Sequence, residues 1–144
     1  MYFNVVDRYR KNKDEGYLLM GFGKKYILEC IRLANTIRLF DDYREISLLT
    51  NSATKLIDLN LSIFQSVIYI DQSDIEDENL HNSYCVKPRI HVPKYTPYVR
   101  TLVVDSDIIC IHSPDYAWAN YASEKSPFCY SGYDYEREWH WGKI

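Results

Sequence analysis

The sequence TLVVDSDII at residues 101–109 places two carboxylates immediately after an apolar run. Asp105 and Asp107 are separated by Ser106 alone, so in extended backbone their side chains lie on the same side of the chain. Neighbouring carboxylates repel each other unless a cation or hydrogen-bond donors compensate their charge. Mg²⁺ or Mn²⁺ is a suitable cation, because such hard ions prefer oxygen ligands and keep positions for phosphate oxygens. The motif is therefore either a metal–diphosphate site or a turn whose aspartates cap backbone amides.

Apolar runs and one helical pattern predict the elements that position this motif. Strands are expected within residues 17–23, 45–51, 66–71 and 98–111, because each is a short apolar run that ends in polar residues or glycine. Residues 24–40 are expected to form a helix, since apolar residues recur there three or four apart. Residues 53–61 predict a short second helix. The rest is expected to be a leader or first strand with a solvated turn (1–16), a loop or short surface helix (72–83) and a weakly periodic tail (112–144).

This order of elements predicts an α/β fold with a mostly parallel, Rossmann-like central sheet and flanking helices. The strand runs are continuously apolar, which is typical of strands buried on both faces of a sheet. No repeat or linker divides the chain, so a single domain is expected over residues 1–144. In such sheets ligands bind outside the carboxyl ends of the strands. That edge is expected to hold Gly21–Gly23, Thr50–Ser52, Asp71 and Asp105–Asp107.

Composition excludes several classes of protein. The net charge is −3 in 144 residues, so the chain lacks the basic character that nucleic-acid binding requires. The four cysteines show no spacing typical of a zinc site, which favours a reducing compartment. Neither a signal peptide nor an apolar run of membrane-spanning length is present, so a cytoplasmic protein without a membrane span is expected.

Three enzyme classes place a DxD motif at the end of such a strand. Phosphatases of the haloacid dehalogenase type carry it early in their core, whereas here only residues 108–144 follow it. Nucleic-acid enzymes of the Toprim type would need a basic surface. Glycosyltransferases with the GT-A fold have the order of elements that this sequence predicts.

From Tyr17 to Ile111 the chain resembles GT-A nucleotide-sugar transferases of the glycogenin and bacterial lipopolysaccharide galactosyltransferase kind. The resemblance is carried by the stretches GFGKKYILECIRLANTIR, ISLLTN, VIYID and KYTPYVRTLVVDSDIIC. It implies a GT-A-type sheet with a shortened C-terminal part, because family members usually continue well beyond the DxD motif. The chain is then either a whole, reduced homologue or one domain of a larger enzyme.

The resemblance also implies roles for individual residues. Asp105 and Asp107 would bind Mn²⁺ or Mg²⁺, and His140 would be a late metal ligand, although a histidine between Trp139 and Trp141 is also typical of packing. His112 is a second candidate for that late ligand. The nucleotide-sugar site would be formed by Gly21, Phe22, Gly23, Thr50, Asn51, Lys87, Asp105 and Ser106. Further basic residues near the same edge are Arg89, Lys94 and Arg100.

The expected function is the metal-dependent transfer of a sugar from a UDP- or GDP-sugar to a hydroxyl of a glycan or glycoconjugate acceptor. The alternative is a catalytically silent nucleotide- or carbohydrate-binding domain of the same fold, which the short tail and the 14 tyrosines favour. A third alternative is a structural or interaction domain. A transferase should show metal-dependent turnover, and a silent domain should bind ligand without turnover. A structural or interaction domain should show no metal-dependent ligand binding.

Overall fold

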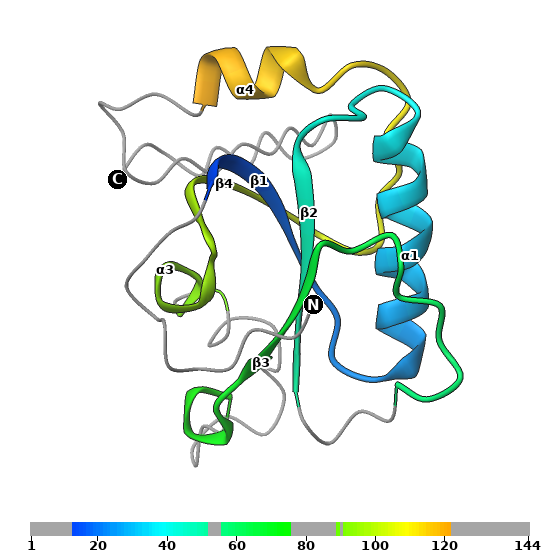
Figure 1. Cartoon of the computed structure of the whole chain (residues 1–144), viewed down its shortest axis with the longest axis vertical. Helices are drawn as coiled ribbons and strands as arrows, with labels where there is room; N and C mark the ends of the chain where they lie inside the picture. Colours follow the sequence, from blue (N-terminus) through cyan, green and yellow to red (C-terminus); the bar gives the residue numbers. More distant parts are fainter. Residues whose placement is uncertain (1–12, 52–55, 76–88, 90, 122–144) are drawn as a thin grey trace, which may run out of the picture.

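The computed structural model describes residues 13–51, 56–75, 89 and 91–121, and these form a four-stranded parallel sheet with flanking helices. The strands lie in the order β3-β2-β1-β4 (Figure 1). Their bounds are β1 (Lys13–Met20), β2 (Glu45–Asn51), β3 (Ser66–Ile70) and β4 (Tyr98–Val104). The helices are α1 (Lys24–Arg38), the 3₁₀ turn η2 (Gln72–Asp74), α3 (Val92–Tyr95) and α4 (Asp115–Tyr121). The α/β prediction is confirmed, and all three pairs of neighbouring strands are parallel.

Helix α1 follows β1 through Gly23, whose φ of 98° turns the chain from the strand into the helix. Its buried positions recur three or four residues apart, so they form one apolar stripe: Ile27, Cys30, Leu33, Ala34 and Ile37. This stripe packs against β1, β2 and β3 in the larger core cluster. The helix prediction over residues 24–40 is therefore confirmed apart from its last two residues.

The two faces of the sheet carry separate cores. On one face α1 covers Leu19, Leu48 and their neighbours. On the other face the short helix α3 brings Val92 and Tyr95 against Leu18 and other sheet residues. Figure 1 shows α1 and α3 on opposite sides of the sheet, with α4 across the end at which β1 begins. Within the described part of the chain, no helix has the length and apolar character needed to cross a membrane.

Strand β4 differs from the prediction of a strand buried on both faces. It pairs with β1 alone among the described strands and so lies at the edge of the sheet. Val99 is 61% exposed and Val103 is 39% exposed. The strand also ends at Val104, and the apolar residues 108–111 form no strand. A continuous apolar run does not distinguish a central strand from an edge strand, because burial depends on neighbours from elsewhere in the chain.

One other boundary and one helix differ from the prediction, and one helix was not predicted. Strand β1 begins at Lys13 rather than at residue 17, because its charged first residues pair with β4, as Glu15 does with Arg100. Residues 56–61 contain a turn at 57–58 and no helix, so the short helix predicted over 53–61 is absent from the part of it that is described. Helix α4 lies in the tail where little periodicity was expected. Its start follows Ser113, whose hydroxyl accepts a hydrogen bond from the backbone of Asp115 at 3.3 Å.

The side chain of Tyr98 on β4 packs over Gly16 of β1. The ring of Tyr98 occupies the space in which a Cβ on Gly16 would stand, 2.5 Å from three ring atoms. Its hydroxyl lies 2.6 Å from that of Ser47, which in turn lies 2.7 Å from that of Ser66. Burial raises the pKa of Tyr98 to about 12, so the phenol stays protonated. The three hydroxyls therefore link β4, β2 and β3 beneath the sheet surface.

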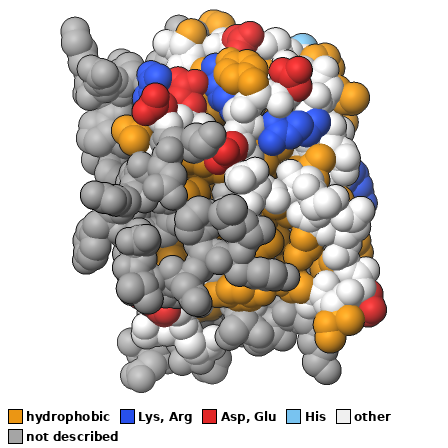
Figure 2. All heavy atoms as spheres, viewed as in Figure 1, with side chains coloured by type: hydrophobic (Ala, Val, Ile, Leu, Met, Phe, Trp, Pro, Cys, Tyr) orange, Lys and Arg blue, Asp and Glu red, His pale blue; other side chains and the backbone are white. Residues whose placement is uncertain are grey.

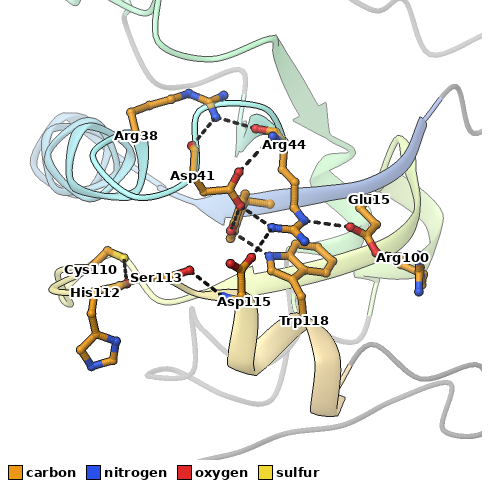
Figure 3. Close-up of polar contacts among 11 residues, drawn as sticks. Glu15, Arg38, Asp41, Arg44, Arg100, Cys110, His112, Ser113, Asp115 and Trp118 are labelled. Carbon is orange, nitrogen blue, oxygen red and sulfur yellow. Dashed lines mark hydrogen bonds and ion pairs between the residues drawn. The ribbon is translucent and has the colours of Figure 1, made fainter.

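A charged network around Arg44 holds α4 to the beginning of the sheet (Figure 3). The guanidinium is largely buried and binds Glu15 at 2.8 Å, Asp41 at 2.8 Å and Asp115 at 3.3 Å. It also lies 4.6–4.7 Å from the rings of Tyr43 and Trp118. Figure 2 shows side chains of both signs of charge at this end of the molecule. Three carboxylates from different parts of the chain therefore compensate the buried charge.

Asp41 and Tyr17 lie at the buried side of this network. The Tyr17 hydroxyl donates to Asp41 Oδ2 at 2.5 Å and accepts from Trp118 Nε1 at 2.8 Å. Burial alone would raise the pKa of Asp41, but hydrogen bonds from Tyr17 and Arg44 outweigh burial and hold that pKa below its ordinary value. Burial and the Asp41 contact raise the pKa of Tyr17. Asp41 is therefore ionised and Tyr17 neutral in the folded protein.

The substitution Gly16→Ala tests the contact between β1 and Tyr98. We expect it to lower the free energy of unfolding by about 1–3 kcal/mol, because the added methyl group overlaps the Tyr98 ring and the core must shift. Urea denaturation measures this loss. The loss should be smaller when Gly16→Ala is made in a Tyr98→Leu background, and equal losses in the two backgrounds would contradict the contact.

The pH dependence of stability tests the role of Asp41. Its folded-state pKa is lowered, so the stability it contributes is complete above the unfolded-state pKa of about 4 and is lost as pH falls through the lower, folded value. The difference in unfolding free energy between the native chain and Asp41→Asn should therefore be constant above about pH 5 and should narrow as the pH falls below about 4. The measurement is urea denaturation at a series of pH values on both sides of about pH 4. Asp42→Asn, at an exposed neighbouring position, is the control. A difference that stays constant over this range would refute the role.

Candidate functional site

All four strands are parallel, so their carboxyl ends lie side by side along one side of the sheet, which is the edge meant below. From β1 the chain adds β2 and then β3 on one side. It then crosses back and adds β4 on the other side of β1. The junction of β1 and β4 is thus the point where the strand order reverses, which is the usual ligand-binding position of such sheets. The register pairs Leu19 with Val104, and the next residues along the two strands lead directly into Gly21–Gly23 and Asp105–Asp107.

The turn after β1 brings backbone close to this edge. The amide of Gly21 donates to the carbonyl of Leu49 at 3.0 Å, which ties the turn to β2. A Cβ on Gly21 would lie 3.1 Å from atoms of Ile27 and Cys30, so a larger residue would push the turn away from α1. Phe22 is half-buried against the core on the α3 face. Of these three predicted residues, the two glycines shape the turn and Phe22 anchors it.

The Asp-Ser-Asp turn follows directly after β4. Asp105 forms an ion pair through Oδ1 with Nη2 of Arg89. The Ser106 hydroxyl donates to Oε2 of Glu29 on α1 at 3.3 Å. Asp107 is exposed and has no hydrogen bond or ion pair to the residues that the structure describes. The two aspartates therefore have different surroundings, and Asp107 is the one open to a ligand.

The end of β2 contributes a buried hydroxyl. Thr50 is fully buried, and its Oγ1 has no hydrogen-bond partner among the described residues. Asn51 follows as the last residue of the strand and is half-buried. An unpartnered buried polar atom is uncommon in proteins. A buried hydroxyl without a partner in the described structure therefore lies at the end of β2, where the resemblance implies contact with the nucleotide.

A second polar cluster joins the end of β3 to α3. Lys94 Nζ binds Asp71 at 3.1 Å and Asp74 at 2.5 Å. The Tyr95 hydroxyl donates to Asp74 at 2.5 Å and accepts the Asp71 amide at 2.9 Å. The hydrogen bonds from Lys94 and then Tyr95 hold the pKa of Asp74 below its ordinary value, and the same contact with Asp74 raises that of Lys94. Lys94 therefore connects α3 to the segment that follows β3.

The described residues contain no group of three or more histidine, cysteine, aspartate or glutamate side chains placed to hold a metal. His112 is thus not brought to Asp105 and Asp107. It is exposed and lies between Cys110, whose amide binds Thr36 on α1, and Asp115 of the Arg44 network (Figure 3). Lys87 and His140, predicted as a nucleotide contact and a metal ligand, lie outside the described residues.

The donor set of the turn nevertheless suits a hard divalent ion. Two carboxylates one residue apart offer oxygen ligands, and Asp107 has no competing partner in the described part of the chain. One oxygen of Asp105 is used by Arg89 in a pair that is about two-fifths exposed on each side, and such pairs exchange at little free-energy cost. Mg²⁺ or Mn²⁺ held here by two carboxylates would keep positions for water and phosphate.

Sequence reasoning did not identify several residues of these networks. Glu29 lies on the partly exposed side of α1. In the sequence it looks like any charged residue on the solvent side of a helix. Asp74 comes from a segment expected to be a loop or short surface helix, and Tyr95 from a segment for which no strand or helix was predicted. Arg44 and Asp41 lie in a turn between α1 and β2. Only Ser113-Pro114-Asp115, a common helix-start pattern, offered a local signal, that of α4.

Comparison of the chain with known protein families and with curated proteins finds no match. Assignment of a function therefore depends on the geometry of the edge at which the four strands end.

Removal of one hydroxyl tests the cluster at the end of β3. Tyr95→Phe leaves the Asp71 amide and an Asp74 oxygen without this partner, so we expect a loss of about 1–2 kcal/mol in unfolding free energy. Hydrogen exchange of the Asp71 amide should also become faster. Tyr69→Phe is the matched control, because Tyr69 lies in β3, two residues before Asp71, and its hydroxyl makes no contact in the described structure. Unchanged exchange at Asp71 in Tyr95→Phe would rule out the hydrogen bond.

Proposed function

We propose that the chain is a metal-dependent glycosyltransferase domain that moves a sugar from a UDP- or GDP-sugar to a hydroxyl of a glycan or glycoconjugate. The observation that carries the proposal is the place of the Asp-Ser-Asp turn. It follows β4 at the point of strand-order reversal, beside the glycine turn that follows β1. A carboxylate pair and close backbone at that point suit a metal ion and a nucleoside diphosphate.

The residues of the edge divide into three roles. Asp105 and Asp107 would hold Mg²⁺ or Mn²⁺, and Gly21–Gly23 would let the nucleotide approach the backbone. Thr50 and Asn51 would contact the nucleotide at the end of β2, where the Thr50 hydroxyl lacks a partner in the described structure. When bound, the metal would supply a Lewis acid that stabilises negative charge on the departing diphosphate.

The surroundings of the turn favour an anionic ligand as well. Helix α1 begins at Lys24, directly after the glycine turn, and a helix N-terminus carries partial positive charge. Lys24 and Lys25 add full charges there, and Arg89 lies beside Asp105. Because the diphosphate of a sugar nucleotide is strongly negative, these groups would hold it in place without taking part in bond breaking.

A silent nucleotide- or carbohydrate-binding domain is the second candidate. The pairing of Asp105 with Arg89 favours it, because an ion pair between protein groups compensates that carboxylate without a metal. The lack of a third metal-ligating side chain in the described ranges points the same way. Such a domain would bind nucleotide through the same edge but would not cleave the sugar–phosphate bond.

A cytoplasmic location is part of the proposal. Cys30 and Cys110 are free thiols, and burial raises the pKa of Cys30 to about 12, so that thiol is inert. Free thiols are typical of proteins in reducing compartments such as the cytoplasm.

The decisive measurement is thermal unfolding of the full chain with a panel of UDP- and GDP-sugars, with and without Mn²⁺. Binding of one donor should stabilise the native chain by about 2.7 kcal/mol at about a hundred times its dissociation constant, only when Mn²⁺ is present. Asp107→Asn should abolish this stabilisation because it removes the ligand without a competing partner. Asp42→Asn, which changes the same charge at the opposite end of the sheet, should not.

The release of nucleoside diphosphate distinguishes the two candidates. A transferase releases it from the donor only when the metal is present, by transfer of the sugar to an added acceptor or to water. A silent domain binds the donor and releases none. If no sugar nucleotide stabilises the chain in a metal-dependent way, both candidates fail and a structural or interaction role remains.

A further inference from the structure

Arg89 occupies the position of a counter-ion in the Asp-Ser-Asp turn. Its Nη2 pairs with Asp105 Oδ1, and the two side chains are 40% and 42% exposed. Glu29 reaches the same turn through its contact with Ser106, whereas Asp107 has no hydrogen bond or ion pair in the described structure. Arg89 therefore compensates the negative charge of Asp105.

No other cation of the described structure is paired with Asp105. Lys94, the nearest basic residue along the chain before β4, is held by Asp71 and Asp74. Lys24 pairs with Asp58 at 3.9 Å. A metal ion that binds Asp105 and Asp107 would thus meet one competitor, the guanidinium of Arg89.

The pair is suited to exchange. It uses a single guanidinium nitrogen and a single carboxylate oxygen, and both groups reach solvent. Exposed pairs of this kind contribute little to stability. An arginine released from Asp105 keeps five N–H donors, and its planar fork matches the oxygens of a phosphate group.

We propose that Arg89 is an exchange residue: it pairs with Asp105 in the metal-free protein and is displaced by the metal to bind the diphosphate of the nucleotide. The inference rests on the proposed function of the edge and adds a rule for how its ligands bind. Metal binding frees Arg89 for the phosphates, and phosphate binding withdraws Arg89 from the metal ligand. The metal and the nucleotide must then increase each other's affinity by the same factor.

The substitution Arg89→Gln separates the two halves of this exchange, because it should change the two affinities in opposite directions. Mn²⁺ alone, measured by calorimetry or by its electron paramagnetic resonance signal, should bind about two- to five-fold more tightly, since the competitor is gone. UDP in the presence of saturating Mn²⁺ should bind roughly ten-fold or more weakly, since a charged hydrogen-bond donor is lost.

Arg32→Gln is the matched control. Arg32 is an exposed residue of α1, and the substitution changes the net charge by the same amount as Arg89→Gln. Any general effect of protein charge on cation binding appears equally in both variants, and only the excess in Arg89→Gln supports the exchange. Arg89→Lys, which keeps the charge without the fork, should bind Mn²⁺ as weakly as the native chain does.

The outcomes separate this inference from the proposed function. If Mn²⁺ affinity is the same in Arg89→Gln and Arg32→Gln, the exchange is wrong even when sugar nucleotides bind. If Arg89→Gln raises Mn²⁺ affinity but no nucleotide binds to any variant, competition for Asp105 stands while the phosphate half and the proposed function fail. If Mn²⁺ binds neither the native chain nor Arg89→Gln, both the exchange and the metal site are refuted.

Discussion

Arg44 carries a positive charge that is almost buried, and the arrangement of the described chain depends on the groups that compensate it. Glu15 comes from β1, Asp41 from the turn after α1, and Asp115 from the start of α4. Trp118 then reaches Tyr17, which is 101 residues earlier in the sequence. Removing one of these partners weakens the compensation of a charge in the interior. The beginning of the sheet is therefore fixed to the segment that follows β4.

This constraint also bears on the opposite edge of the sheet. The chain that leaves the Asp-Ser-Asp turn runs along α1, where the Cys110 amide binds Thr36, and is held at its far end by α4. The turn is thus attached on one side to β4 and on the other to a segment anchored on α1 and Arg44. The position of the turn is therefore set by contacts on both sides of it in the sequence.

Local patterns in the sequence predicted most of the secondary structure and the edge on which the candidate site lies. The helical spacing from Ile27 to Ile37 and the apolar runs of β2 and β3 are short-range signals, and each matches the element that formed. The start of β1 was missed because its charged residues are neutralised by a distant strand, as Glu15 is by Arg100. The exposure of β4 was missed because apolar character does not reveal which strands lie beside it.

The sequence by itself determined the α/β class and the types of side chain that follow each strand, because both depend on residues adjacent in the chain. The tertiary structure decided which of those side chains meet: Asp105 with Arg89, Ser106 with Glu29, and Lys94 with Asp71 and Asp74. These pairs join residues from different elements, and ion pairs form only where the packing of those elements brings opposite charges together. The Asp-Ser-Asp turn could be found in the sequence, but the arginine beside its first carboxylate could be found only in the fold.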